Sequence, residues 1–146
     1  MQNPEFGKTE QPARVKLTGR VISGARRAAG FTQLDWVQDQ CLKKLGFRPY
    51  PGTLNVEISA ESLAALKALE MQASTALIPP DPAFCEAKVL FLSAGSIPGA
   101  MVIPAEDVRI HDKKVIEVIA PVNLRDSLSL KDGDLITLFL ETHKIL

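Results

Sequence analysis

The sequence has no excess of charge of either sign, because 17 lysines and arginines balance 17 aspartates and glutamates among 146 residues. A protein that coats nucleic acid depends on an excess of basic residues, so we expect no nucleic-acid partner. Long apolar runs are also missing, and the stretch at residues 89–92 is far too short to span a membrane. No charged and then apolar leader opens the chain, which favours a cytoplasmic protein with no membrane partner.

Cysteines and aromatic residues are scarce. Cys41 and Cys85 form no CxxC pair and have no neighbouring histidine, so neither a metal cluster nor a disulfide framework is indicated. We interpret both as small buried apolar residues in a reducing compartment. Hydrophobic residues make up 46% of the chain, which is enough for one domain to close a core without such staples.

The pattern of apolar residues predicts one mostly β domain with a few helices. Residues 1–13 lack periodicity and predict a flexible tail, and residues 14–146 predict a single domain. Many short strands that do not alternate regularly with helices favour a small closed β-barrel over a doubly wound sheet. The predicted strands begin near residue 14 and cover residues 53–58, 85–92, 99–103, 108–110, 115–119 and 135–140.

Helices are predicted at three places. Asp35 and Ser59 are expected to cap the first two, and Gly46 is the stop signal of the first. A short third helix is expected at residues 123–130. Residues 75–82 contain three prolines and predict a loop.

Glu117 interrupts an otherwise apolar predicted strand. Val115 and Ile119 share its face, so the carboxylate is expected to be partly removed from water. A carboxylate in such a setting suits a general base near neutral pH. The alternative is an ordinary surface glutamate paired with a lysine such as Lys114.

Thr53 and Asn55 lie two residues apart on a predicted strand, so their side chains leave from the same face, with Glu57 further along. Neutral oxygens of this kind suit Mg²⁺, which takes a few protein oxygens together with water and phosphate. The alternative is the ordinary polar outer face of a strand.

A loop of small residues with two arginines follows the first predicted strand. Its backbone N–H groups and its arginines could approach a phosphate, although the loop lacks the Gly-Lys-Ser/Thr ending of a Walker A motif. The alternative is a solvated surface loop. The residues predicted to contact a nucleotide here are Ala25, Arg26, Arg27, Ala28, Ala29 and Gly30.

Several segments together resemble the archaeal-type CTP-dependent riboflavin kinases. The order and spacing agree over residues 17–140, nearly the whole chain. The segments that carry the resemblance are Gly-Arg-Val-Ile-Ser-Gly at residues 19–24, Gly-Phe-Arg-Pro-Tyr-Pro-Gly-Thr-Leu-Asn at 46–55, Ile-Glu-Val-Ile-Ala-Pro at 116–121, Leu-Arg at 124–125 and Lys-Asp-Gly-Asp at 131–134.

The resemblance implies a six-stranded cradle-loop β-barrel that transfers the γ-phosphate of CTP to the 5′-hydroxyl of riboflavin, giving FMN and CDP. At the matching positions, Thr53 and Asn55 would hold Mg²⁺ and Glu117 would accept the proton of the attacking hydroxyl. The expected partners are the small molecules riboflavin and CTP. The implied nucleotide pocket adds Val122, Asn123, Leu124 and Arg125 to the loop at residues 25–30.

Two segments depart from the family pattern. The family usually has a Gly-x-Gly-Glu-Gly-like loop, where this chain has Gly-Ala-Arg-Arg-Ala at residues 24–28. A flavin-contacting Thr-x-His segment is expected before Glu117, and this chain keeps His111 but has Arg109 in place of the threonine. We therefore carry a second hypothesis, a barrel that binds a nucleotide or flavin in a sensing or regulatory role without transferring phosphate.

Overall fold

The computed structural model describes residues 10–24, 28–83, 86–104 and 114–145. In chain order its elements are β1 (Glu10–Ile22), α1 (Ala28–Gln33), α2 (Asp35–Leu45), β2 (Leu54–Ile58), the 3-10 turn η1 (Ala60–Ser62), α3 (Leu63–Gln72), β3 (Thr75–Leu77), β4 (Ala87–Ala94), β5 (Ile97–Pro104), β6 (Val115–Ile119), α4 (Leu124–Leu128) and β7 (Leu135–Ile145).

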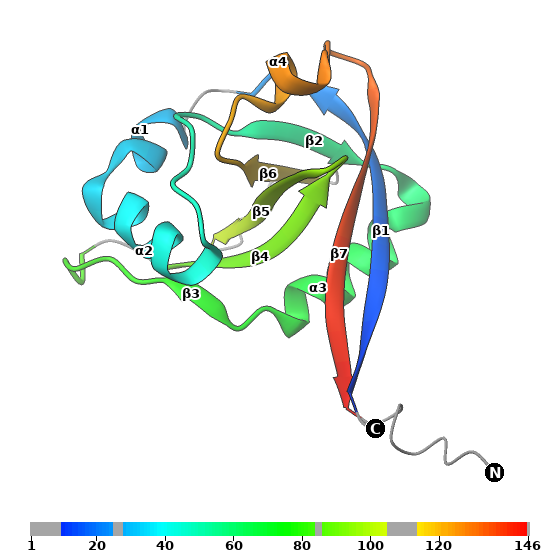
Figure 1. Cartoon of the computed structure of the whole chain (residues 1–146). Helices are drawn as coiled ribbons and strands as arrows, with labels where there is room; N and C mark the ends of the chain where they lie inside the picture. The colour runs from blue at the N-terminus through cyan, green and yellow to red at the C-terminus, as the bar shows by residue number, and fades with distance from the viewer. Residues whose placement is uncertain (1–9, 25–27, 84–85, 105–113, 146) are drawn as a thin grey trace.

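Six of the strands in the described ranges form a closed antiparallel barrel (Figure 1). Their order is β4-β5-β6-β2-β1-β7, and β7 pairs back with β4 at Ser93↔Phe139 and Ala94↔Leu138 to complete the circle. The short β3 is added outside this circle, along β4. The predicted mostly β, six-stranded barrel is therefore confirmed.

Strict alternation of side chains explains the barrel interior. In β2, Leu54, Val56 and Ile58 are buried and the residues between them are half-buried. Inward residues of β1, β6 and β7 meet them in one cluster, closed from the side by Leu66 and Leu69 of α3. Burial of these side chains is the main force that closes the barrel.

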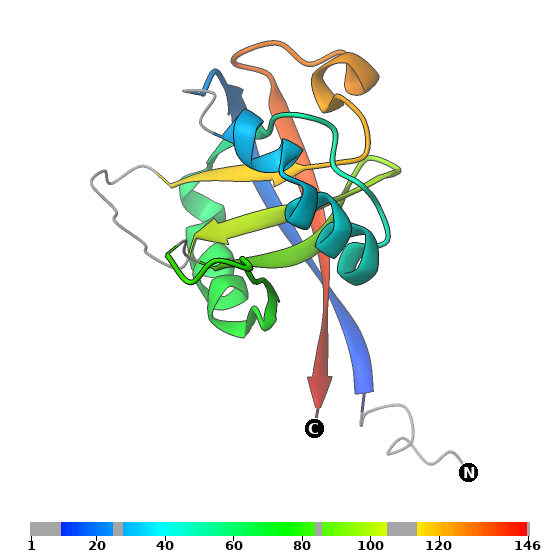
Figure 2. The ribbon, with the colours of Figure 1, turned by 90° about the vertical axis from the view of Figure 1, so that its left-hand side faces the viewer.

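A second apolar cluster lies outside the barrel, where α2 covers β4, β5 and β6 (Figure 2). Val37 and Cys41 of α2 are fully buried against residues that include Ile119 of β6. The predicted helix is confirmed, and it ends at Gly46 in the left-handed conformation at φ 86°, where glycine has no steric cost. The predicted cap Asp35 is wrong, because Leu34 occupies the N-cap position and no side chain caps the helix.

The remaining differences occur where a segment depends on a distant partner. β1 begins at Glu10, inside the predicted tail, because it continues its pairing with β7 from Arg20↔Leu135 to Glu10↔Ile145. In Figure 1 these two strands run on together past the end of the barrel. β3 lies in a predicted loop, since it gains hydrogen bonds from β4. Ser59 precedes a 3-10 turn rather than an α-helix, and its side chain makes no cap bond.

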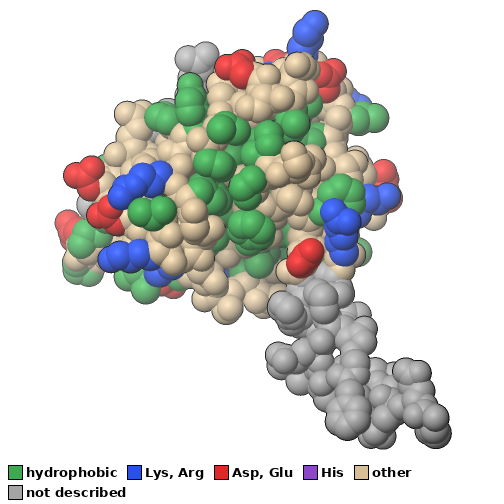
Figure 3. Space-filling view, viewed as in Figure 1, with side chains coloured by type: hydrophobic (Ala, Val, Ile, Leu, Met, Phe, Trp, Pro, Cys, Tyr) green, Lys and Arg blue, Asp and Glu red, His purple; other side chains and the backbone are tan. Residues whose placement is uncertain are grey.

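The surface shows no broad region of one charge on the face of Figure 3. Hydrophobic side chains gather in the middle of this face, and the charged groups lie mainly around its edge. No helix among the described residues is long and apolar enough to cross a membrane.

Candidate functional site

Thr53, Asn55 and Glu117 come together where β2 pairs with β6, and we call these three residues the oxygen cluster. Asn55 lies directly opposite Glu117 in the antiparallel register. The hydroxyl of Thr53, just before β2, donates a hydrogen bond to Oε1 of Glu117 at 3.1 Å. All three side chains are half-buried. Two segments more than sixty residues apart in the sequence thus place a carboxylate beside two neutral oxygen groups.

Glu117 points to the outer side of the barrel because its neighbours Ile116 and Val118 fill the interior. On that outer side, Val115 is 43% exposed and Ile119 is completely buried beneath α2. Glu117 therefore stands at the boundary between solvent and the second apolar cluster. The described residues show Glu117 hydrogen-bonded to Thr53 and no ion pair between Glu117 and Lys114.

The end of β1 lies against the oxygen cluster. A Cβ atom on Gly24 would come within 1.9 Å of Nδ2 of Asn55, so any other residue at this position would displace the Asn55 side chain. The predicted nucleotide loop continues from this point, and Ala25, Arg26 and Arg27 lie outside the described residues. The prediction of a loop through residue 30 is wrong, because Ala28–Gln33 form the helix α1.

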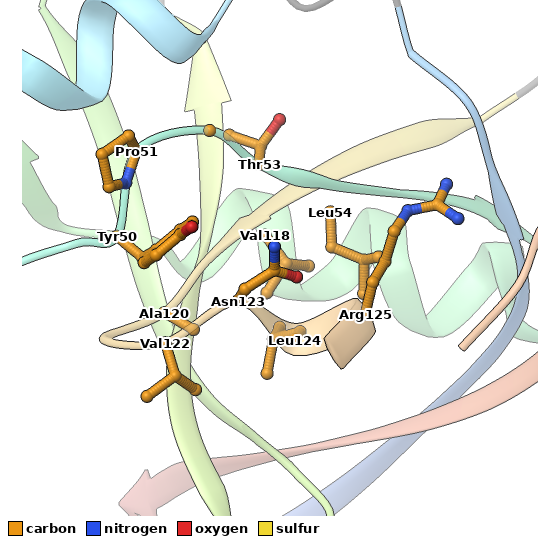
Figure 4. Close-up of a pocket in the computed structure, with 11 residues that line it drawn as sticks. Tyr50, Pro51, Thr53, Leu54, Val118, Ala120, Val122, Asn123, Leu124 and Arg125 are labelled. Carbon is orange, nitrogen blue, oxygen red and sulfur yellow. The ribbon is translucent and has the colours of Figure 1, made fainter. Parts of the chain in front are cut away.

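A pocket of about 120 Å³ opens beside the oxygen cluster (Figure 4). Tyr50 and Pro51 form one side, Arg125 forms the other, and Asn123 lies between them. Thr53 belongs to both the pocket and the oxygen cluster. The full lining is Tyr50, Pro51, Gly52, Thr53, Leu54, Val118, Ala120, Val122, Asn123, Leu124 and Arg125.

The four residues predicted to complete a nucleotide pocket, Val122 to Arg125, all line this pocket. Asn123 is the N-cap of α4, and its Oδ1 accepts a hydrogen bond from the Asp126 N–H at 3.2 Å. This satisfies one of the N–H groups that the start of a helix leaves without a partner. The predicted helix start at Asn123 is confirmed, although the helix is shorter than expected.

Arg125 is held in place by contacts that the sequence did not indicate. Its Nη2 donates to the carbonyl of Ile22 at 3.1 Å and to Oδ1 of Asp132 at 2.6 Å. Ser23 donates its hydroxyl to the other carboxylate oxygen. Hydrogen bonds from Ser23 and Arg125 hold the pKa of the Asp132 carboxyl below its usual range. The charge of Arg125 is thus balanced by Asp132, and the network joins the end of β1 to the pocket wall.

Sequence reasoning treated Asp132 only as part of a turn and did not select Tyr50 for the pocket wall. The Lys-Asp-Gly-Asp motif at residues 131–134 gave a weak signal, because a turn needs only glycine and one aspartate. Tyr50 is 46% exposed despite its large ring, a common property of residues that contact ligands. The predicted flavin contacts Arg109 and His111 lie outside the described residues.

Comparison with known proteins places this site in a family. The family model CTP-dep_RFKase, described as domain of unknown function DUF120, matches residues 21–140. The chain belongs to this family. The matched range includes the oxygen cluster and the pocket, and the resemblance found in the sequence is confirmed.

Relatives of the chain include proteins named riboflavin kinase. One from Archaeoglobus fulgidus is 38% identical over 136 residues, which is 90% of this chain and 55% of the relative. One from Pyrobaculum aerophilum is 35% identical, over 85% of this chain and 60% of the relative. One from Methanobrevibacter smithii is 36% identical, over 84% of this chain and 98% of the relative. The chain thus spans little more than half of the first two relatives and nearly all of the third.

The oxygen cluster of this family member has the chemistry that a magnesium ion needs. Mg²⁺ prefers hard oxygen donors and keeps several positions for water and substrate phosphates. Thr53, which lines the pocket, and Asn55, which pairs with Glu117 across β2 and β6, offer two neutral oxygens beside a carboxylate. Among the described residues, no group of three or more His, Cys, Asp or Glu side chains could hold a metal alone. Such a donor set can supply part of the coordination of Mg²⁺ and leaves the remaining positions to other oxygen ligands.

Proposed function

We propose that the chain is the kinase domain of a CTP-dependent riboflavin kinase, transferring the γ-phosphate of CTP to the 5′-hydroxyl of riboflavin. The products are FMN and CDP. The observation that carries the proposal is the hydrogen bond to Glu117 from Thr53, a residue that lines the pocket, with Asn55 opposite Glu117. Phosphoryl transfer depends on this combination of an oriented nucleophile and neutralised phosphate charge.

Glu117 is the proposed general base. Its carboxylate takes the proton of the riboflavin 5′-hydroxyl while that oxygen forms a bond to the γ-phosphorus. The bond from the γ-phosphorus to the bridging oxygen breaks, and its electron pair leaves with CDP. The hydrogen bond from Thr53 fixes Oε1 of Glu117 and leaves the second carboxylate oxygen to receive the proton.

Thr53 and Asn55 are the residues proposed to hold Mg²⁺. The bound ion supplies neutralisation of phosphate charge. Thr53 is held by its hydrogen bond to Glu117, and the Asn55 side chain occupies the space that a Cβ of residue 24 would take. The hydrogen bond keeps the Thr53 oxygen at one place before substrate binds, which lowers the cost of ordering it.

The pocket between Tyr50 and Arg125 is proposed to take part of the nucleotide. Its volume of about 120 Å³ is smaller than a typical complete ligand site, so further contacts must come from elsewhere. Residues 25–30 are the proposed source, because Gly24 brings that segment to Asn55. In Figure 4 the Asn123 side chain faces the space between Tyr50 and Arg125, where its amide can meet polar atoms of a ligand. Flavin contacts are assigned to Glu117 and, beyond the described residues, to Arg109 and His111.

The experiment is direct. Purified protein is incubated with riboflavin, Mg²⁺ and one of CTP, ATP, GTP or UTP, and FMN is followed by chromatography. We expect FMN with CTP and much less with the other three nucleotides. The donor assignment is wrong if another nucleotide supports faster turnover. The absence of FMN with every nucleotide would overturn the kinase, and tight binding of CDP or FMN by calorimetry would then support the binding-only hypothesis.

A further inference from the structure

Thr32 is a buried polar residue with no part in the reaction proposed above. It lies in α1, and its side chain is completely inaccessible to solvent. Its Oγ1 accepts a hydrogen bond from the backbone N–H of Gly52 at 2.8 Å. Gly52 immediately precedes Thr53 of the oxygen cluster, so a buried hydroxyl of α1 acts one residue away from the proposed metal ligand.

The segment at residues 49–52, which we call the proline turn, is held from two sides. From the helical side, Nε2 of Gln38 donates to the carbonyl of Thr32 at 2.6 Å and to that of Pro49 at 2.8 Å. From the barrel side, the Tyr50 N–H donates to the carbonyl of Ala120 at 2.7 Å. In Figure 1 the chain leaving α2 runs back past α1 before it enters β2, which is the path that these bonds maintain.

Gly52 is the point in the proline turn that most needs a restraint. Its φ of 106° lies in the region that side chains avoid, and no heavy atom lies within 4 Å of where its Cβ would be. A glycine with open space around it can change its dihedral angles at little steric cost. Rotation there would swing Thr53 away from Glu117, and the Thr32 hydroxyl opposes that rotation by fixing the Gly52 N–H.

We propose that Thr32 is a positioning residue: by holding Gly52 it keeps the Thr53 hydroxyl against Glu117, and its catalytic effect rests on the proposed function. The same bond connects α1 to the oxygen cluster, and α1 begins directly after residues 25–27 of the predicted nucleotide segment. Small displacements of reacting groups are costly, since about 1 Å can lower a rate about 100-fold.

The test compares two variants at Thr32 with a matched control at Ser62. Thr32→Val keeps the shape and removes the acceptor, and Thr32→Ser keeps the acceptor. Ser62 is the other buried polar residue of the described chain, and its Oγ accepts the Thr18 N–H at 3.1 Å. Ser62→Ala therefore also removes a buried hydroxyl that accepts a backbone N–H, but its partner is Thr18 of β1 and not the proline turn or the oxygen cluster. The two losses should lower the melting temperature to a comparable degree.

The expected kcat values distinguish a loss of positioning of Thr53 from a general loss of stability. Thr32→Val should lower kcat by about 10-fold to 100-fold with little change in the KM for riboflavin, Thr32→Ser should restore most of kcat, and Ser62→Ala should leave kcat unchanged. If Thr32→Val does not fold, Gln38→Met removes the neighbouring hold on the proline turn and should show the same kcat loss. Equal kcat values for Thr32→Val and Ser62→Ala would overturn the proposal.

A second measurement does not require activity. Amide hydrogen exchange, followed by NMR, should accelerate at Gly52 in Thr32→Val, and the Thr53 resonance should shift, with neither change in Ser62→Ala. Unchanged exchange at Gly52 would overturn the positioning role even in a chain that makes FMN. A wild-type chain that makes no FMN would instead refute the proposed function, and the amide data would then decide the role of Thr32 alone.

Discussion

Gly24→Ala is the change that tests most sharply how the end of β1 serves the site. The new methyl group would lie 1.9 Å from Nδ2 of Asn55 and 2.5 Å from its Cγ. No left-handed φ is involved at Gly24, so the backbone itself accepts alanine without strain. The whole perturbation therefore falls on the Asn55 side chain.

The size of the effect follows from these distances. Ordinary contact begins near 3.4 Å, so the Asn55 amide must withdraw by about 1.5 Å, more than the roughly 1 Å that can cost 100-fold in rate. The amide is the end of a side chain and can rotate, which costs about 0.5–1.5 kcal/mol for an unfavourable rotamer. We expect kcat to fall about 100-fold while the melting temperature falls by only a few degrees.

Gly99→Ala is the control for this prediction. Its Cβ would meet the backbone carbonyl of Ile119 at 2.7 Å, and backbone cannot rotate away as a side chain can. This variant should lose more stability than Gly24→Ala and keep its kcat once the folded fraction is taken into account. Thermal unfolding by circular dichroism and FMN formation with CTP measure the two quantities. A Gly24→Ala chain with unchanged kcat would refute the reasoning.

Three further predictions concern other groups. Glu117→Gln should lower kcat by about 10²–10⁴-fold without unfolding the chain, whereas Glu57→Gln on β2 should not; equal rates for the two variants would assign the base elsewhere. Because the pKa of Asp132 is lowered in the folded chain, its carboxylate stabilises the fold at every pH above the usual aspartate pKa of about 3.9. This stabilisation is lost as the pH falls through the lowered pKa. The melting temperature of Asp132→Asn should therefore lie below that of the unchanged chain from about pH 5 to 7 and approach it in acid; a constant difference down to pH 2 would contradict this. Burial raises the pKa of the Cys41 thiol to about 11, with Lys44 opposing the shift, so in a Cys85→Ser background a thiol reagent at pH 8 should react only as fast as the chain opens; rapid labelling of the folded chain would show that the site is exposed.

The local pattern of the sequence predicted most of the barrel. The short apolar run at Val115–Ile119 predicted a strand with the observed bounds, and the helix Asp35–Leu45 followed from apolar spacing and the glycine that stops it. Both elements carry enough apolar residues to reveal which face is buried. Thr75–Leu77 could not be predicted in this way, because a three-residue strand exists only through its hydrogen bonds to β4.

The candidate site also has features that the sequence predicted and features that only the structure showed. Thr53 and Asn55 share a face because of the strand period alone, and Glu117 was notable as a carboxylate in an apolar strand. Their meeting depends on the register between β2 and β6, which no local pattern contains. Arg125 was expected as positive charge for the nucleotide, and only its contact with Asp132 revealed that this charge is already balanced.

The sequence by itself thus determined the class of fold, the family and the identity of the oxygen groups, since these depend on residue type and on short-range spacing. Tertiary structure alone decided that Gly24 leaves room for the Asn55 side chain, that Thr32 holds Gly52, and that Asp132 binds Arg125. Each of these contacts joins residues brought together by barrel closure or by the return of the chain past α1. Such contacts depend on the strand register and on the need of each buried polar group for a hydrogen-bond partner. The pattern of residues along the sequence contains neither.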